Sequence, residues 1–230
     1  MHLAEVDSTN RYLIDEARGG AVDGLVVVAD HQTAGRGRLG RTWDSGSGSS
    51  LLVSVLLRID GGSPDRQVAV MTAAVAMAEA IETTTGVVPS VKWPNDLLVG
   101  DKKLAGILAE AIADAVVVGV GVNLDWQAMP PELAHATACN LEGGQPTTRD
   151  QLLGAFLDRY DSLLRDPATA RALYVDRLST LGRTVRVELQ GDTVVGLATG
   201  IDEAGRLVVE PDGERPVVLA AGDVVHLRGA

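Results

Sequence analysis

The sequence predicts an α+β fold with two parts, a main domain over residues 1–181 and a small β-barrel domain over residues 182–230. Before residue 182, apolar residues at helical spacing alternate with short β-branched runs, a pattern typical of helices packed on a sheet. From residue 182 onward, alternating apolar residues are separated by Gly, Asp and Pro turns, which indicates short strands closing into a barrel.

The first elements are one short helix and two strands. Asp7-Ser8-Thr9-Asn10 supplies side-chain oxygens that can cap a helix, which we expect over residues 11–18, before Gly19-Gly20. Compact apolar runs at residues 25–29 and 51–57 predict buried strands, and we expect a loop between them.

The longest predicted helix begins at Ser63-Pro64-Asp65, where a capping residue precedes a first-turn proline, and it ends at Gly86. Strands are then expected at residues 91–93, 97–99, 104–108 and 116–122, with Gly100-Asp101 as a hairpin turn. Two further helices are expected at residues 149–164 and 168–178. The predicted barrel strands lie at residues 185–189, 194–195, 207–209, 217–219 and 224–227.

Composition limits the class of function. Asp and Glu outnumber Lys and Arg by 31 to 20, and the net charge of -11 disfavours a general nucleic-acid binder, so an anionic ligand needs a local basic cluster. The lone Cys139 excludes an internal disulfide and a multi-cysteine zinc site. Apolar stretches such as residues 111–122 are too short to cross a bilayer, and no secretory signal is visible. We therefore expect a cytoplasmic protein with no nucleic-acid or membrane partner.

A glycine–arginine loop follows the first predicted strand. Gly35-Arg36-Gly37-Arg38-Leu39-Gly40 matches the spacing of a dinucleotide-binding fingerprint. That fingerprint opens a helix, whereas the following residues lead into the serine–glycine tract 45–50, a poor helix former. We interpret the loop, with Arg36, Arg38 and Arg41, as an anion-binding segment; the alternative is a solvated basic loop.

All three lysines of the chain, Lys92, Lys102 and Lys103, lie in one short window, whereas arginine is the ordinary cation elsewhere. A compact ammonium suits a position where charge moves during a reaction. The alternative is that Lys102 and Lys103 are ordinary solvent-exposed residues at the tip of a hairpin.

Two segments place polar groups at strand ends. In Lys92-Trp93-Pro94-Asn95-Asp96, proline breaks a strand and leaves an amide and a carboxylate just beyond it. Asp96 is a candidate ligand for Mg²⁺, although an Asx turn also explains this pair. The glycines of Gly119-Val120-Gly121 predict a strand that a ligand or another backbone approaches closely, with Asn123 at its exit.

Four segments together resemble one family, the biotin protein ligases. They are Asp7-Ser8-Thr9-Asn10, residues 31–43, Lys92-Trp93-Pro94-Asn95-Asp96 with residues 103–108, and Gly119-Val120-Gly121-Val122-Asn123-Leu124. With the β-rich tail they cover nearly the whole chain, and the second and third segments are each specific to the family.

The resemblance implies a catalytic domain with a mixed sheet, related in architecture to class II aminoacyl-tRNA synthetases, followed by an SH3-like barrel. It implies a biotin–[acetyl-CoA-carboxylase] ligase, which activates biotin with ATP and Mg²⁺ to biotinyl-5'-AMP and pyrophosphate. Biotin is then transferred to a lysine of a biotin carboxyl carrier protein domain of acetyl-CoA carboxylase or a related carboxylase. Such a site has to bring two anions together and keep water from a reactive anhydride.

The resemblance also implies roles for residues of this sequence. The implied biotin-binding residues are Ser8, Thr9, Asn10, Gln32, Gly35, Arg36, Arg38, Lys103 and Gly106. The implied nucleotide-binding residues are Arg38, Arg41, Trp43, Asn95, Asp96, Asn123 and Arg228. Lys103 would bridge the biotin carboxylate and the α-phosphate, Arg38 would assist in catalysis, and Asp96 would serve Mg²⁺.

Regulatory members of the family carry a DNA-binding domain ahead of the catalytic part, whereas Ser8 lies almost at the start of this sequence. We therefore expect a monofunctional ligase without an N-terminal DNA-binding domain. We also expect the loop around Arg38 to be disordered until a ligand binds. Two alternatives remain, a lipoate–protein ligase and a non-catalytic sensor of biotin or its adenylate.

Overall fold

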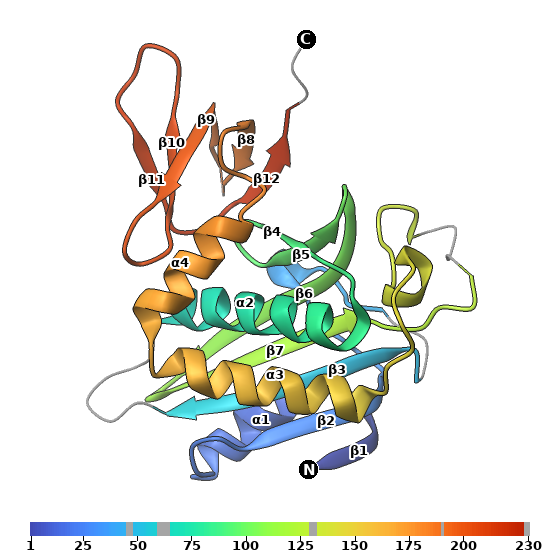
Figure 1. Cartoon of the computed structure of the whole chain (residues 1–230). Coiled ribbons are helices and arrows are strands. Elements are labelled where there is room, and N and C mark those ends of the chain that lie inside the picture. The colour runs from blue at the N-terminus through green and yellow to red at the C-terminus, as the bar shows by residue number, and fades with distance from the viewer. Residues whose placement is uncertain (45–47, 59–64, 129–132, 190, 228–230) are drawn as a thin grey trace.

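The computed structural model describes residues 1–44, 48–58, 65–128, 133–189 and 191–227. Within these residues the chain forms a seven-stranded sheet flanked by helices and a separate five-stranded antiparallel sheet (Figure 1). The α+β class and the β-rich C-terminal domain are confirmed. The second sheet begins at Thr184, and the domain boundary after residue 181 stays a prediction.

The large sheet has the strand order β1-β2-β3-β7-β6-β5-β4. Its strands are β1 (His2–Val6), β2 (Val26–Gln32), β3 (Ser50–Arg58), β4 (Ser90–Lys92), β5 (Asp96–Val99), β6 (Lys102–Ile112) and β7 (Ala115–Asn123). β1 runs parallel to β2 and the other described pairs are antiparallel, so the sheet is mixed, as expected. The sequence pattern misses β1 because this edge strand has no buried apolar run.

Helices cover both faces of the large sheet. They are α1 (Thr9–Arg18), α2 (Arg66–Thr85), α3 (Arg149–Leu164) and α4 (Pro167–Arg177). On one face, Leu13 of α1 packs in a small core with Leu56 of β3. On the other face, alternate residues of β3 such as Val55 join the main core, which includes α2 and α3. β3 is buried on both sides, which explains its continuous apolar run.

The start of α2 differs from the prediction. Its N-cap is Asp65, whose carboxylate accepts from the backbone of Gln67 at 2.7 Å, while Ser63 and Pro64 lie outside the described residues. The predicted end at Gly86 is confirmed, because this residue caps the helix with a φ of 78°. Among the described residues, α2 is the one helix long and apolar enough to cross a membrane, and 72% of its apolar window is buried inside the protein, as in a core helix.

The C-terminal sheet packs beside β4 and β5 (Figure 1). Its strands are β8 (Thr184–Glu188), β9 (Thr193–Ile201), β10 (Leu207–Glu210), β11 (Val217–Leu219) and β12 (Asp223–His226). The carbonyl oxygen of Gly205 accepts from Trp93 Nε1 at 3.0 Å and from Gln67 Nε2 at 3.2 Å. Arg171 of α4 donates to the carbonyl oxygens of Ile201 and Asp202. These contacts hold the small domain against the large one.

Candidate functional site

A cavity of about 390 Å³ opens where the large sheet meets the glycine–arginine loop and the start of β12. The predicted site residues that line it are Ser8, Thr9, Asn10, Gln32, Arg36, Arg38, Arg41, Trp43, Asn95, Asp96, Lys103, Gly106 and Asn123. Gly35 is buried next to it, against Gln32 and the backbone of Trp43. Arg228 lies outside the described residues. Segments far apart in the sequence therefore converge on one cavity.

One end of the cavity is a neutral polar corner formed by Thr9, Asn10 and Gln32, and the buried Ser54 supports it from behind the lining. The backbone N–H and the hydroxyl of Thr9 donate to Gln32 Oε1 at 2.8 and 3.0 Å. Ser54 Oγ lies 2.8 Å from Thr9 Oγ1 and 2.7 Å from Asn10 Oδ1. Since these groups are fixed and uncharged, the corner suits a small, neutral, polar ring.

Two features of this corner differ from the sequence interpretation. Ser8 is the N-cap of α1, but its side chain makes no capping hydrogen bond. The oxygen-rich start of α1 therefore contributes to the cavity and not to helix capping. The sequence analysis missed Ser54, which supports Thr9 and Asn10 from behind the cavity lining. It stands out as a hydroxyl within the otherwise apolar run of β3, and it is fully buried.

Glu110, also missed, ties the polar corner to the glycine–arginine loop. Its Oε2 accepts from Asn10 Nδ2 at 2.9 Å, and its Oε1 accepts from Arg36 Nη2 at 2.6 Å. The sequence signal that could have identified Glu110 is its position as a lone acid near the end of the otherwise apolar strand β6. Through Glu110, the loop and the first turn of α1 are held in one hydrogen-bonded chain.

Glycines allow side chains to cross the floor of the cavity. A Cβ on Gly121 would lie 2.5 Å from the ring of Trp43, and one on Gly106 would lie 3.1 Å from it. A Cβ on Gly119 would overlap the side-chain amide of Asn10. Close approach to β7 is present, but the approaching groups are two side chains of this chain, Asn10 and Trp43, and not the ligand or backbone that the sequence analysis expected. Trp43 Nε1 is buried and makes no hydrogen bond within the described residues.

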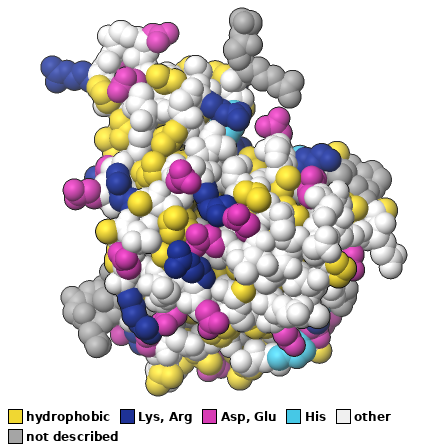
Figure 2. Space-filling model, in the orientation of Figure 1, with side chains coloured by type: hydrophobic (Ala, Val, Ile, Leu, Met, Phe, Trp, Pro, Cys, Tyr) yellow, Lys and Arg dark blue, Asp and Glu magenta, His cyan; other side chains and the backbone are white. Residues whose placement is uncertain are grey.

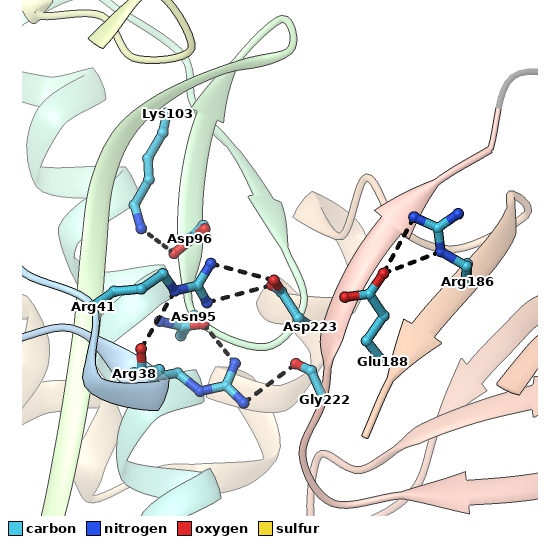
Figure 3. A network of polar contacts seen from close by, with 9 residues as sticks. All are labelled: Arg38, Arg41, Asn95, Asp96, Lys103, Arg186, Glu188, Gly222 and Asp223. Carbon is cyan, nitrogen blue, oxygen red and sulfur yellow. Dashed lines mark hydrogen bonds and ion pairs between the residues drawn. The ribbon is translucent and has the colours of Figure 1, made fainter. Parts of the chain in front are cut away.

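The other end of the cavity is cationic, and three of its cations are paired with carboxylates of the same chain; Figure 3 shows the pairs of Lys103 and Arg41. The pairs are Lys103–Asp96 at 2.7 Å, Arg36–Glu110 at 2.6 Å and Arg41–Asp223 at 3.3 and 3.4 Å. The first two pairs are the shorter and the less exposed. Asp223, which the sequence analysis also missed, follows a glycine at the start of β12. An entering anion has to compete with these carboxylates.

Arg38 has no ion-pair partner within the described part of the chain. Its guanidinium donates to Asn95 Oδ1 at 3.0 Å and to the carbonyl oxygen of Gly222 at 3.3 Å (Figure 3). Burial lowers the pKa of Arg38, and the charges of Asp96 and Asp223 oppose that effect. A half-buried guanidinium whose hydrogen-bond acceptors are both neutral is a strong site for an anionic ligand.

The structure tests whether the residues around Asp96 suit Mg²⁺. Among the described residues, no group of three or more His, Cys, Asp or Glu side chains could hold a metal ion. Asp96 offers one carboxylate, which Lys103 pairs with. Asn95 uses its amide nitrogen on the carbonyl oxygen of Ile107 and its oxygen on Arg38. A magnesium ion here would need most of its oxygen ligands from phosphates and water, as is usual for this ion.

A segment after β7 folds back along the cavity, which the sequence analysis missed. Lys103 forms a bridge with Ala136, and its backbone N–H donates to the carbonyl oxygen of His135. Asn123 is buried and donates through Nδ2 to the carbonyl oxygen of Thr137 at 2.9 Å. Trp126 packs in a small apolar cluster with Ala136. Trp126 and Ala136 therefore form an apolar wall beside the cations, which suits the binding of a flat aromatic ring of a ligand.

The chain matches known proteins over both domains. Residues 3–125 match the Biotin/lipoate A/B protein ligase family, and residues 180–227 match the Biotin protein ligase C terminal domain. The biotin–[acetyl-CoA-carboxylase] ligase of Mycobacterium tuberculosis is 38% identical and covers 98% of this chain and 88% of its own length. The corresponding ligase of Paracoccus denitrificans is 31% identical, and the match covers 95% of this chain and 97% of that ligase. The structure of the biotin protein ligase of Aquifex aeolicus in complex with biotin and ATP is similar, with a TM-score of 0.84 and 28% sequence identity. The match covers 100% of this chain and 98% of that protein.

Proposed function

This chain belongs to the biotin protein ligase family, and from that membership we propose how its own residues perform the reaction. Its function is that of a biotin–[acetyl-CoA-carboxylase] ligase that uses biotin and ATP. The observation that carries the proposal is the joining of a neutral polar corner and a cationic end in one cavity. The corner suits the ureido ring of biotin, and the cations suit its carboxylate and the phosphates of ATP.

In the first step, a carboxylate oxygen of biotin attacks the α-phosphorus of ATP, an O–P bond forms, and pyrophosphate leaves. Lys103 supplies an ammonium beside Asp96, and its Nζ lies 5.6 Å from the centre of the Trp43 ring. Arg38 supplies a half-buried guanidinium that has no ion-pair partner among the described residues. Both charges are placed before the reaction begins, so they stabilise the negative charge that develops at phosphorus.

In the second step, a lysine amine attacks the carbonyl carbon of the mixed anhydride, an amide forms, and AMP leaves with release of a proton. The acceptor is a biotin carboxyl carrier protein domain of acetyl-CoA carboxylase or a related enzyme. The corner formed by Thr9 and Gln32, which Ser54 supports from behind, keeps the biotin ring in place between the two steps. Asp96 would contribute one oxygen to a Mg²⁺ ion that neutralises phosphate charge.

A nucleic-acid partner has no support in the surface charge. On the face shown in Figure 2, Lys and Arg side chains are interspersed with Asp and Glu and form no continuous basic patch. The net charge of -11 agrees with this picture. The C-terminal domain match and the named relatives favour biotin over lipoate as the substrate.

The test is mass spectrometry of a purified biotin-carrier domain after incubation with this protein, biotin and Mg-ATP. A mass increase equal to one biotin is expected, and a parallel incubation with lipoate should leave the carrier unchanged. Biotin binding without pyrophosphate release from ATP would point to the non-catalytic sensor alternative. Transfer of lipoate but not biotin would overturn the assignment.

A further inference from the structure

Asp223 contacts the glycine–arginine loop from the C-terminal domain. Its two carboxylate oxygens face the guanidinium of Arg41 at 3.3 and 3.4 Å, and the neighbouring carbonyl of Gly222 accepts from Arg38 (Figure 3). Both Arg41 and Asp223 line the cavity. An arginine of the cationic end is therefore held by a carboxylate that belongs to another domain.

The contact is the weakest of the three ion pairs in the cavity. The exposed fractions of the two side chains are 57% for Arg41 and 38% for Asp223. The corresponding fractions are 44% and 21% for Arg36 and Glu110, and the pair is also shorter. Long, exposed ion pairs contribute little to the stability of a protein. A phosphate of higher charge can therefore displace the Asp223 carboxylate from Arg41.

The two partners differ in how firmly they are held. Asp223 opens β12, which pairs with β8, and the small domain is fastened to the large one through Gly205. The backbone of Arg41 is also held, because its N–H donates to the carbonyl oxygen of Arg38 and its own carbonyl accepts from Gly37, but its long side chain is 57% exposed and free to change rotamer. When the pair opens, we therefore expect Arg41 to move and Asp223 to stay.

We propose that Asp223 is a positioning residue that holds Arg41 away from the polyphosphate site. When ATP binds, its phosphates replace Asp223 as the partner of Arg41, and Asp223 binds Arg41 again when pyrophosphate leaves. The inference rests on the proposed function, because it assigns a polyphosphate to this cavity. Competition between an internal carboxylate and a phosphate lowers affinity for the nucleotide and eases release of the product.

The test compares Asp223→Asn with Glu214→Gln in the full chain. Both substitutions replace a carboxylate by a neutral amide, so the two variants lose the same charge. Glu214 is the control because it is an exposed acid between β10 and β11, outside the cavity lining. Calorimetric titration with inorganic pyrophosphate should show tighter binding to Asp223→Asn by about 3- to 10-fold, and no change for Glu214→Gln. In steady-state assays, the KM for ATP should fall by a similar factor while the KM for biotin stays constant. Unchanged or weaker pyrophosphate binding by Asp223→Asn would overturn the proposal.

A second pair of variants separates positioning from direct repulsion. In an Arg41→Ala background, most of the effect of Asp223→Asn on pyrophosphate binding should disappear, because the carboxylate no longer has a guanidinium to hold. If the full effect persists, Asp223 acts directly on the phosphate, and the positioning role is wrong. Failure of the wild-type protein to form adenylate would reject the proposed function, whereas the pyrophosphate titration would still decide the role of Asp223.

Discussion

The side-chain amide of Asn10 occupies the space that a Cβ atom on residue 119 would need. Asn10 lies at the start of α1 and Gly119 in the middle of β7, so helix and strand meet here only because residue 119 is glycine. The contact leaves Asn10 between Ser54 and Glu110, with one hydrogen bond to each. The geometry of the polar corner thus depends on a missing side chain.

Gly119→Ala should therefore impair biotin binding. The added methyl group pushes Asn10 out of the corner, and we expect the KM for biotin to rise by about 10- to 100-fold, as for other misplacements near 1 Å. The measurement is initial-rate kinetics at saturating ATP. The control is Gly154→Ala in α3, where a Cβ meets nothing within 4 Å and the helix should gain up to about 1 kcal/mol. An unchanged KM for Gly119→Ala would contradict this role of Asn10.

Ser54→Ala and Ser50→Ala form a matched pair on β3. Ser54 Oγ is within hydrogen-bonding distance of Thr9 and Asn10, whereas Ser50 Oγ is buried without a hydrogen bond in the described residues. Urea unfolding should show a loss of about 1–3 kcal/mol for Ser54→Ala, since buried acceptors lose their donor. Ser50→Ala should be neutral within about 0.5 kcal/mol or stabilising. Equal effects of the two changes would show that the network around Ser54 contributes nothing.

Lys103→Ala should reduce adenylate formation by about 100-fold or more, the scale seen when one preorganised donor to a transition state is removed. Lys102→Ala is the control, because Lys102 is the exposed neighbour on the same strand and lies outside the cavity lining. Pyrophosphate release with biotin and ATP reports the rate for both variants. A near-normal rate for Lys103→Ala would reject its assignment.

His226 should make stability depend on pH. Burial, with the positive charges of Lys92 and Arg183, lowers the pKa of His226 to about 4, and the ring lies 3.2 Å from Thr180 Oγ1. The unfolded chain therefore takes up a proton at a higher pH than the folded chain. The contribution of His226 is present above pH 6.5 and is lost as the pH falls toward about 4.

The melting temperature measured from pH 7.5 to 4 tests this expectation. His226→Gln should lose less stability than the wild type over the acidic part of that range, because glutamine does not titrate. Parallel curves for the two proteins would mean that other groups cause the acid sensitivity.

Most of the site could be predicted because its residues lie in short, distinctive segments. Thr9, Arg38 and Lys103 were each singled out from the sequence, and each lines the cavity. Their roles toward biotin and ATP stay predictions. Ser54 and Asp223 could not be found in the same way, because a lone serine in a strand and a lone acid after a glycine are common patterns.

The sequence by itself determined the order of the main elements, the change to a β-rich tail and the identity of the basic loop. These features depend on local periodicity, turn residues and charge, which act over a few neighbouring positions. Only the tertiary structure decided that Asn10 crosses Gly119, that Glu110 holds Arg36 and that Asp223 holds Arg41. Such contacts join residues far apart in the chain, and packing between sheets and helices, not local preference, sets which of them meet.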